Sequence, residues 1–539
     1  FDDRSGEEII FITKNCWFPT VSEADVTAAI QSLPDKQCDL DPIPTWLLKV
    51  NARYLAPFIS KLFNTSLSAG QVPSIFKTAY VVPRLKKPDL DADDIKNYRP
   101  ISNLPVLTKL LERIVAKHLV DYLKLYGIMP RLQSAYRAEH STETALLKVP
   151  IDILTALDSG DLASLALLDM SAAFDTVDHN IMLRRLQTSY GIRGVALDWF
   201  RSYLTGRLQY VRYAGRHSAT RPLLYGVPQG SVLGPILFIL YTADLAAVIE
   251  RHGLLPHLYA DDTQIVGSCR PTDTASLSFS VESCIADVAS WMSANRLQLN
   301  AAKTELMWCS TSRRHHQLPA NGLSIGQDII QPVHCVRDLG LYLDSTLSMR
   351  NHVTRLTSTC FGVLRQIRCI RRNLSRRALA MLVTCFVFVR LDYCNATFIG
   401  LPHCDLNRIQ AVQNAAVRLV AGASRFDHVT PLLRERHWLP VHLRVVYKMA
   451  VIVYKCLAAT SADYLTALTR PPVSTTTLRL RSADTRCLHV PRTRTGYGDR
   501  AFSVAGPRLW NSLPDSVKSA SSLGTFKQRL KTHLFRSLD

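Results

Sequence analysis

Several features that often define a protein class are missing from this sequence of 539 residues. Its 13 cysteines, from Cys16 to Cys487, form no Cys-x-x-Cys pair and no Cys/His cluster at zinc-finger spacing. An odd and unpatterned set of cysteines argues against a secreted disulfide framework and favours a reducing compartment. No signal peptide opens the sequence, and its first residue is Phe1 rather than methionine, so we expect it to be part of a longer polypeptide.

Hydrophobic runs of membrane-spanning length are scarce as well. One run of eighteen residues, from Val232 to Ile249, is long enough, but it contains Pro235 and Asp244. An unpaired carboxylate in the middle of a bilayer is costly. We therefore expect this run to be a buried core helix, and we expect no membrane partner.

Acidic residues are depleted in one part of the chain only. Residues 346–539 hold 30 Lys+Arg and 9 Asp+Glu, a net charge of +21. The whole chain has 64 and 44, so residues 1–345 hold 34 and 35, a net charge of −1. A field of one sign confined to one region suits a polyanion such as RNA or DNA. The alternative is that these basic residues serve only solubility.

Periodicity and composition predict an α+β protein with several lobes, because 539 residues exceed one compact core. The spacing of Ser22 and Asp25 predicts a helix near residues 22–33. Further expectations are a strand at Thr78–Pro83, a helix at Leu104–Leu125, Arg-rich helices from 346 to about 425, a linker or loosely held arm at 469–500, and a basic helix at Leu523–Leu534.

Carboxylates stand at two places where strands are predicted to end. The apolar run Leu165–Leu168 stops at Asp169, which places this acid at the tip of a buried strand. Asp261 and Asp262 lie between two β-prone runs and so fall at the turn of a hairpin. Acids at a hairpin turn are also ordinary surface residues, so this pair alone is weak evidence of a site.

Two further segments accompany these acids in a fixed order. A Gly-rich loop, Gly226–Pro235, opens onto an apolar helix, and Asn300-Ala-Ala-Lys303 precedes Asp338–Asp344. Nucleotidyl transfer needs two divalent cations about 3.5–4 Å apart, and Mg²⁺ prefers carboxylate ligands. Asp169 and Asp261 on neighbouring strands would bridge both metals, with Asp262 as a secondary ligand.

These segments resemble motifs A to E of reverse transcriptases, and the chain is similar to polymerases of the jockey and chicken-repeat clades of non-LTR retrotransposons. The resemblance covers roughly residues 20–535 and includes segments outside the motifs, namely Val82–Lys87, Asn97–Ser102, Gln133–Arg137, His140–Thr144, Phe426–Thr430, Trp438–Pro440 and Arg508–Pro514. It implies a right-hand polymerase fold, with an N-terminal extension at 1–65, fingers at 66–160, an antiparallel-sheet palm at 161–345, a helical thumb at 346–425 and a basic, mainly helical region at 426–539.

The resemblance also implies roles for individual residues. Asp169, Asp261 and Asp262 match the catalytic and metal-binding triad for two Mg²⁺ ions, with Mn²⁺ as a substitute. Residues that match dNTP-binding positions are Lys86 and Arg99 on the triphosphate, Phe174 as the steric gate beneath the sugar, Gln229 and Gly230 on the nucleotide and template, and Lys303 as proton donor to pyrophosphate. The neighbouring Lys87 is an alternative to Lys86. Without the motif context, Phe174 could simply be core, Arg99 a surface residue and Lys303 a turn residue.

Other charged residues are expected to have simpler roles. Asp175 and Asp178 are expected in the first turn of a helix, where they complement its dipole, and not in the active site. Arg365, Arg368 and Arg372 recur at three- and four-residue spacing, so we expect them on one helix face that binds nucleic acid.

The implied activity is RNA-directed DNA polymerisation by target-primed reverse transcription. The implied partners are an RNA template, a DNA primer in target DNA, deoxynucleoside triphosphates and an endonuclease domain upstream of this chain. The implied location is intracellular, in the nucleus and in cytoplasmic ribonucleoprotein. An RNA-dependent RNA polymerase is a rival, but the ring of Phe174 would clash with a ribose 2′-hydroxyl. A catalytically inactive or domesticated copy that only binds nucleic acid is the second rival.

Overall fold

The computed structural model describes residues 18–36, 38–325, 328–469 and 487–538. Its contacts divide the chain into two compact units, each built from discontinuous segments. Unit 1 comprises residues 1–136, 170–247 and 287–300, and unit 2 comprises residues 137–169, 248–286 and 301–539. Both contain helices and sheets, so the predicted α+β class is confirmed. The borders of the five predicted regions stay predictions.

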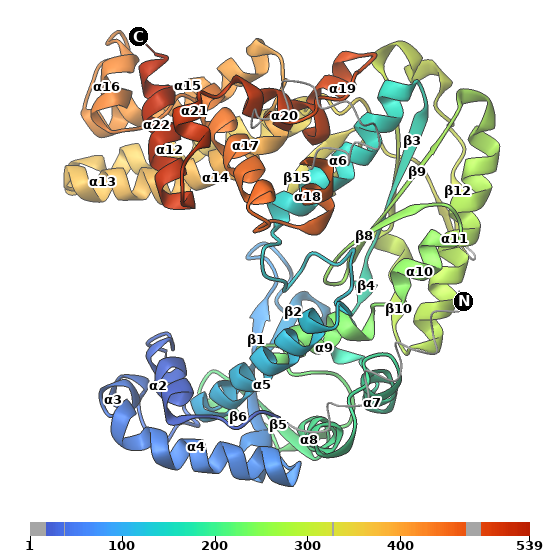
Figure 1. Ribbon diagram of the computed structural model, residues 1–539, viewed down its shortest axis with the longest axis vertical. Helices are drawn as coiled ribbons and strands as arrows, with labels where there is room; N and C mark the ends of the chain where they lie inside the picture. Colours follow the sequence, from blue (N-terminus) through green and yellow to red (C-terminus); the bar gives the residue numbers. More distant parts are fainter. Residues whose placement is uncertain (1–17, 37, 326–327, 470–486, 539) are drawn as a thin grey trace, which may run out of the picture. The chain divides into compact units, whose positions relative to one another are not determined.

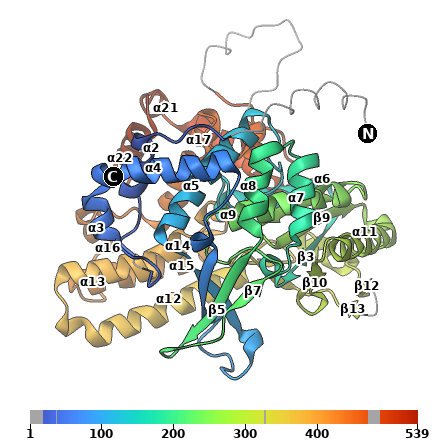
Figure 2. The same cartoon turned by 90° about the horizontal axis from the view of Figure 1, so that it is seen from below.

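Unit 1 is built on a sheet of the order β2-β1-β5-β6, in which β7 also pairs with β5. β1 runs antiparallel to β2 and parallel to β5. Figure 2 shows β5 and β7 side by side. The strands are β1 (Thr78–Leu85), β2 (Tyr98–Asn103), β5 (Arg207–Tyr213), β6 (Arg216–His217) and β7 (Arg221–Leu223), and a separate pair joins β4 (Met170–Ser171) to β10 (Gln298–Leu299).

Two helices of unit 1 were predicted from the sequence, and both are present. Ser22 caps α2 in a capping box with Asp25, which confirms the helix expected near residues 22–33. The helix expected at Leu104–Leu125 is also confirmed, as α5. The helices are α2 (Glu23–Gln31), α3 (Thr45–Val50), α4 (Ala52–Ala69), α5 (Val106–Leu125), α7 (His179–Thr188), α8 (Gly194–Leu204) and α9 (Leu233–Tyr241), with 3-10 turns η2 (Ser74–Lys77), η3 (Ile95–Asn97) and η4 (Ala173–Asp175).

The long apolar run forms two helices rather than one, α9 and α10 (Leu245–Glu250). Its stretch Leu233–Glu250 has the length and composition to cross a membrane, and 61% of that stretch is buried inside the protein. Asp244 lies between the two helices and forms an ion pair with Arg185 at 2.5 Å. The prediction of buried core helix is thus confirmed, with a break that the sequence did not reveal.

Unit 2 is built on an antiparallel sheet of the order β11-β3-β9-β8. Helix α6 (Thr142–Ser159) packs on this sheet, and Leu146, Val149 and Ile153 share one core with Leu165 and Val266. Figure 1 shows β3 and β9 side by side beside α6. The strands are β3 (Leu162–Leu168), β8 (Leu255–Tyr259), β9 (Asp262–Cys269) and β11 (Glu305–Cys309), followed by the hairpins β12 (Leu323–Ile325) with β13 (Asp328–Ile330) and β14 (Cys335–Asp338) with β15 (Leu341–Asp344).

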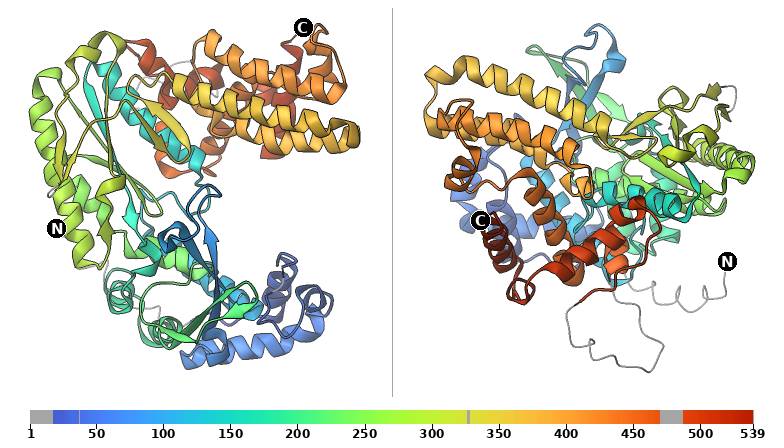
Figure 3. Two further views of the ribbon diagram at one scale, coloured as in Figure 1. Left: turned by 180° about the vertical axis from the view of Figure 1, so that it is seen from behind. Right: turned by 90° about the horizontal axis from the view of Figure 1, so that it is seen from above.

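The rest of unit 2 is helical, as predicted for residues 346–425 and for the basic helix near the C-terminus. Helices α12 and α15 lie side by side (Figure 3). The helices are α11 (Thr274–Ala294, which continues into unit 1), α12 (Arg350–Ile370), α13 (Arg376–Val383), α14 (Val389–Asp392), α15 (His403–Ala421), α16 (Val429–Glu435), α17 (Val441–Leu457), α18 (Asp463–Thr469), α19 (Gly496–Arg500), α20 (Phe502–Ser512), α21 (Asp515–Lys518) and α22 (Leu523–Arg536). Short turns are η5 (Pro271–Asp273), η6 (Ala301–Lys303), η7 (Ser312–Gln317), η8 (Arg371–Asn373), η10 (Asn395–Phe398) and the π-helical segment η9 (Thr384–Phe388).

The segment at 487–500 is firmly attached, so the prediction of a loosely held arm is wrong for this described part. The backbone N–H and hydroxyl of Thr495 donate to the Asp158 carboxylate of α6 at 2.7 and 2.8 Å. Residues 470–486 of the predicted linker lie outside the described residues. The sequence missed this attachment because Asp158 is 337 residues away from Thr495.

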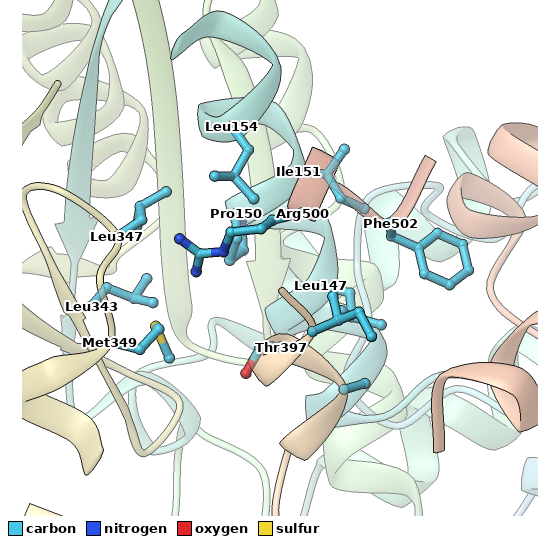
Figure 4. A pocket seen from close by; sticks show the side chains of 12 residues that line it. Leu147, Pro150, Ile151, Leu154, Leu343, Leu347, Met349, Thr397, Arg500 and Phe502 are labelled. Atoms are coloured by element: carbon cyan, nitrogen blue, oxygen red, sulfur yellow. The ribbon is translucent and has the colours of Figure 1, made fainter. Parts of the chain in front are cut away.

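Arg500 extends the same attachment into the core of unit 2. Its side chain enters an apolar cavity between Leu154 of α6 and Leu347 after β15 (Figure 4). Burial lowers the pKa of the guanidinium, and its Nε atom has no hydrogen-bond partner in the described part of the chain. The C-terminal helices therefore share a core with α6 and are not a separate lobe.

Candidate active site

Asp169 stands directly after the last residue of β3, as the sequence predicts. Leu162, Ala163 and Leu165 of this strand are fully buried. The register pairs Leu168 with Thr263, so the chain passes from β3 to Asp169 beside the first residues of β9. The Asp169 side chain is 26% exposed, so a buried strand presents this carboxylate at its open end.

The predicted hairpin turn is also confirmed. Tyr259 of β8 pairs with Asp262 of β9, and Ala260 and Asp261 form the two-residue turn between them. Ala260 has a φ of 56°, the left-handed conformation that tight hairpin turns require at this position. Because β3 and β9 are neighbours, the turn holds both acids next to the end of β3.

The three acids repel one another. The pKa of Asp262 is raised to about 6, first by desolvation and then by the charges of Asp261 and Asp169, while Lys303 lowers it. Lys303 lies in η6, and its Nζ donates to Asp169 Oδ2 at 3.0 Å. The site therefore concentrates negative charge and holds one cationic side chain against it.

Hard carboxylate oxygens on strand ends are the donor set that a divalent cation such as Mg²⁺ takes, so the chemistry of these residues fits such an ion. After desolvation, the charges of Asp261 and Asp169 are the next causes of the raised pKa of Asp262, as expected for acids that lie close together. In the described residues, no three His, Cys, Asp or Glu side chains are gathered tightly enough to hold a metal as they stand. The carboxylates must turn toward one another to share a cation.

A cavity of about 170 Å³ borders Asp169, Asp262 and Lys303. The cavity is also lined by Asp338 of β14, which is only 2% exposed and has a pKa raised to about 7, chiefly by burial. Gln264 Nε2 donates to Asp338 Oδ1 at 2.7 Å, whereas Oδ2 has no partner among the described residues. The sequence placed Asp338 in a motif but did not predict that its carboxyl group is buried in the wall of this cavity.

In unit 1, the Gly-rich loop is bound along its length to the segment that contains Phe174. Val227 N–H donates to Phe174 O and Gly226 N–H donates to Val177 O, both at 2.8 Å. Gly226 has a φ of +83°, and a Cβ there would lie 2.8 Å from Asp175 O. Only glycine allows this approach, because backbone atoms cannot yield to a side chain.

Gln229 and Gly230 occupy the next part of the loop. Gln229 O accepts from Ser102 N–H of β2 at 2.7 Å, and a Cβ on Gly230 would lie 2.5 Å from Ser102 O. Gln229 Nε2 donates to Asp175 Oδ2 at 2.8 Å. The expectation that Asp175 merely complements a helix dipole is therefore wrong: it lies in a 3-10 turn and fixes the Gln229 side chain.

Asp178 behaves as predicted. It is the N-cap of α7 and accepts from the backbone N–H groups of Asn180 and Ile181 at 2.9 and 3.0 Å. Such caps stabilise a helix start by satisfying donors that have no intrahelical partner.

Glu112 of α5 supports the far end of the loop, and the sequence gave no sign of this. Its buried carboxylate accepts from Val232 N–H at 2.5 Å and from the Tyr203 hydroxyl at 2.9 Å. Burial raises the pKa of Glu112, and these donors together with Arg207 counteract the shift. The start of α9 is thus fixed by a carboxylate 120 residues away.

Phe174 lies in η4 and is partly exposed, so it is not an ordinary core residue. Its ring stacks on Phe238 of α9, with a centroid distance of 4.5 Å and an interplanar angle of 25°. Ala172, two residues before Phe174, has a φ of +48°, a left-handed conformation that turns the chain after Asp169.

Lys86 and Arg99 lie on the β1–β2 hairpin. Both are exposed, and neither has an ion-pair partner among the residues that the structure describes. Lys86 follows the last residue of β1, and its Nζ donates to Lys96 O at 2.7 Å. Arg99 pairs across the strands with Arg84, which is a further exposed cation. This hairpin therefore offers positive charge to an anion.

The predicted arginine face of the thumb is only partly supported. Arg365 and Arg368 are exposed on α12, but α12 ends at Ile370 and Arg372 lies in η8. Arg372 is exposed too, but it is on the turn and not on the same helix face.

Comparison with known proteins shows which proteins this chain is similar to. The model described as reverse transcriptase (RNA-dependent DNA polymerase) matches residues 85–342. The chain is 28% identical to the probable RNA-directed DNA polymerase from transposon BS of Drosophila melanogaster, over 76% of this chain and 46% of that protein. It is 28% identical to the corresponding protein from transposon X-element of the same fly, over 73% and 43%.

A third relative is the RNA-directed DNA polymerase from mobile element jockey of Drosophila funebris, at 27% identity over 68% of this chain and 40% of that protein. The chain thus spans less than half the length of these relatives. The structure of apo telomerase from Candida tropicalis, at 12% identity and a TM-score of 0.36, covers 55% of this chain and 59% of that chain, which is too weak to support an argument.

Proposed function

Residues 85–342 form a reverse transcriptase domain related to those of non-LTR retrotransposons, and from this premise we propose that the chain extends a DNA primer 3′ end on an RNA template. Domains of this family depend on metal ions and act on nucleic acid and nucleotides. The observation that carries the proposal is the placement of Asp169 at the end of β3, next to the β8–β9 turn with Asp261 and Asp262.

Asp169, Asp261 and Asp262 are proposed to hold two Mg²⁺ ions, for which Mn²⁺ can substitute. When bound, such ions lower the pKa of the primer 3′-hydroxyl and neutralise the triphosphate. The raised pKa of Asp262 supports this role, because a cation would relieve the repulsion among the acids. Lys303 already partly offsets this charge at Asp169, and we propose that it protonates the leaving pyrophosphate.

The side chains of unit 1 are proposed to bind and select the nucleotide. Lys86 and Arg99 are unpaired by acids in the described residues and would bind the triphosphate as charge-assisted donors. Gln229 and Gly230 would contact the base and the template, since loop contacts on both sides fix their backbone. Phe174 would lie beneath the sugar and exclude a ribose 2′-hydroxyl.

The partners in a longer polypeptide remain part of the proposal. An endonuclease domain upstream, a nicked target DNA as primer and a nuclear and cytoplasmic ribonucleoprotein location follow from the resemblance alone. The exposed arginines Arg365, Arg368 and Arg372 would contact phosphates of the template–primer duplex.

Primer extension tests the proposal. The purified chain is mixed with a labelled DNA primer annealed to RNA, with the four dNTPs and Mg²⁺. Template-dependent extension that stops when the metal is chelated supports the function. A chain that binds the duplex but adds no nucleotide under these conditions is an inactive nucleic-acid-binding copy, and the proposal is then wrong.

A further inference from the structure

We propose that Phe238 is a positioning residue for sugar selection: its ring backs the ring of Phe174, so that rejection of ribonucleotides depends on both. This inference rests on the proposed function, because it takes Phe174 as the residue beneath the incoming sugar. Phe238 is not part of any motif named above, and in the sequence it is one apolar residue in a run of them.

The contact between the two rings is close. Their centroids are 4.5 Å apart and their planes differ by 25°, which is a stacked arrangement. Phe174 is partly exposed, whereas Phe238 is fully buried. One face of the Phe174 ring is therefore covered by a side chain that solvent does not reach.

Phe238 is held rigidly because α9 is fixed at both ends. At its start, the Glu112 carboxylate accepts from Val232 N–H at 2.5 Å. At its end, the Tyr241 hydroxyl donates to Asn295 O at 2.6 Å. Leu237 and Ile239, on either side of Phe238, are at most 1% exposed. Such packing leaves a side chain one rotamer and little room to tilt.

The main chain of Phe174 is tied to the segment that leads into α9. Phe174 O accepts from Val227 N–H at 2.8 Å, and Val227 precedes α9 by a short loop. Residues 227–238 thus hold Phe174 twice, by a hydrogen bond to its backbone and by a ring beneath its side chain. These two contacts restrict movement of both the backbone and the ring of Phe174.

Steric exclusion works only if the excluding group cannot move. A 2′-hydroxyl adds one oxygen atom, so a small tilt of the Phe174 ring would make room for it. The stacked contact opposes that tilt, and aromatic contacts of this kind contribute about 0.5–1.5 kcal/mol beyond burial, which corresponds to about 2- to 12-fold in a rate ratio. Loss of the Phe238 ring should therefore weaken discrimination without removing it.

The experiment compares addition of dCTP and CTP opposite guanine in an RNA template, by wild type, Phe238→Leu and Phe238→Met. Both variants should lower the preference for dCTP by about 3- to 10-fold, with little change in the rate for dCTP itself. Phe200→Leu is the matched control, because Phe200 is also a buried phenylalanine of unit 1, on α8, and its ring partners are Phe18 and Trp199. It should lower stability but leave the preference unchanged.

Unchanged preference in the Phe238 variants overturns the inference. If thermal melting shows that Phe238→Leu does not fold, Phe238→Met decides, because methionine nearly conserves volume while it removes the flat ring. A double variant tests whether Phe238 acts through Phe174. If it does, adding Phe238→Leu to Phe174→Ala should not lower the preference for dCTP over CTP any further. A full additional loss contradicts this. If wild type adds no dCTP at all, the proposed function fails, and that result is distinct from all of these.

Discussion

Unit 2 carries its three acids at the ends of strands, next to like charges, whereas unit 1 carries Phe174 and Gln229 inside a network of hydrogen bonds and ring contacts. The pKa of Asp262 is raised by desolvation and then by the like charges of Asp261 and Asp169. In contrast, Phe174 and Gln229 are each fixed by residues from distant parts of the chain. Under the proposed function, unit 2 therefore supplies the charge for catalysis and Phe174 and Gln229 of unit 1 select the nucleotide.

The two units also differ in how they can tolerate change. Repelling acids are stabilised by any cation, so their geometry is set by what binds them. The loop at Gly226–Gly230 is set by contacts with backbone atoms, and a Cβ at either glycine would clash at under 3 Å. Substitutions of the three acids of unit 2 should therefore alter the rate of the reaction, and substitutions of Phe174 in unit 1 should alter which nucleotide is used.

The largest effect is expected at the acids. Asp169→Asn or Asp261→Asn should lower the rate of primer extension by at least about 10³-fold with nearly unchanged template binding, because a neutral amide is a poor ligand for a divalent cation. Extension assays and duplex binding measure the two quantities. Asp178→Asn is the matched control, since it makes the same change at a helix cap. Wild-type extension by Asp261→Asn would refute the assignment.

The next effect concerns the sugar. Phe174→Ala or Phe174→Val should increase the use of ribonucleotides relative to deoxynucleotides on the order of 10²-fold, because removal of the ring removes the steric barrier to the 2′-hydroxyl. Single-nucleotide addition with dCTP and CTP measures the ratio. An unchanged ratio would mean that Phe174 serves only packing and does not discriminate between ribonucleotides and deoxynucleotides.

A smaller effect is expected at the exposed arginines, which extend the comparison to the basic part of unit 2. Replacement of Arg365, Arg368 and Arg372 by Gln should flatten the slope of log affinity against log salt by about two to three units if all three contact phosphates. Products should become shorter, with little change in single-nucleotide addition. Duplex binding at several salt concentrations measures the slope. If the slope does not change, these side chains face solvent.

The smallest effect is on stability and concerns Asp338. Its folded-state pKa of about 7 lies above the ordinary value of 3.8, so the folded protein binds this proton more tightly than the unfolded chain does. Wild-type stability should therefore fall as the pH rises from about 4 to about 7. Asp338→Asn should remove this loss and raise stability at pH 8 by on the order of 2 kcal/mol. Thermal melting at pH 4 and pH 8 measures it, and a variant less stable than wild type at pH 8 would contradict the burial argument.

The sequence predicted the parts of the site that depend on local pattern. An apolar run that ends in Asp169 and two acids between β-prone runs define strand ends without knowledge of the rest of the fold. It missed Asp175 and Glu112, whose partners Gln229 and Val232 are 54 and 120 residues away. A carboxylate in a helix or turn has an ordinary surface explanation, and only the packed chain reveals which backbone or amide donors it meets.

The same limit explains the errors in the fold. The break between α9 and α10 and the end of α12 at Ile370 contain no Gly or Pro that would mark them in the sequence. The attachment of Thr495 to Asp158 joins residues 337 positions apart, and no local pattern of Ser, Thr and Arg predicts it. Composition correctly indicated charge and class, but it cannot report which distant segments share a core.

The most direct test measures single-turnover addition of dCTP and CTP by wild type, Asp261→Asn and Phe174→Ala. It asks whether the acids of unit 2 set the catalytic rate while Phe174 of unit 1 sets the choice of sugar. Asp261→Asn should lower the rate of addition of both nucleotides by at least about 10³-fold, whereas Phe174→Ala should add dCTP at nearly the wild-type rate and CTP faster than wild type does. These separate roles are contradicted if Asp261→Asn adds dCTP at the wild-type rate, or if Phe174→Ala lowers the rate of dCTP addition as much as Asp261→Asn does.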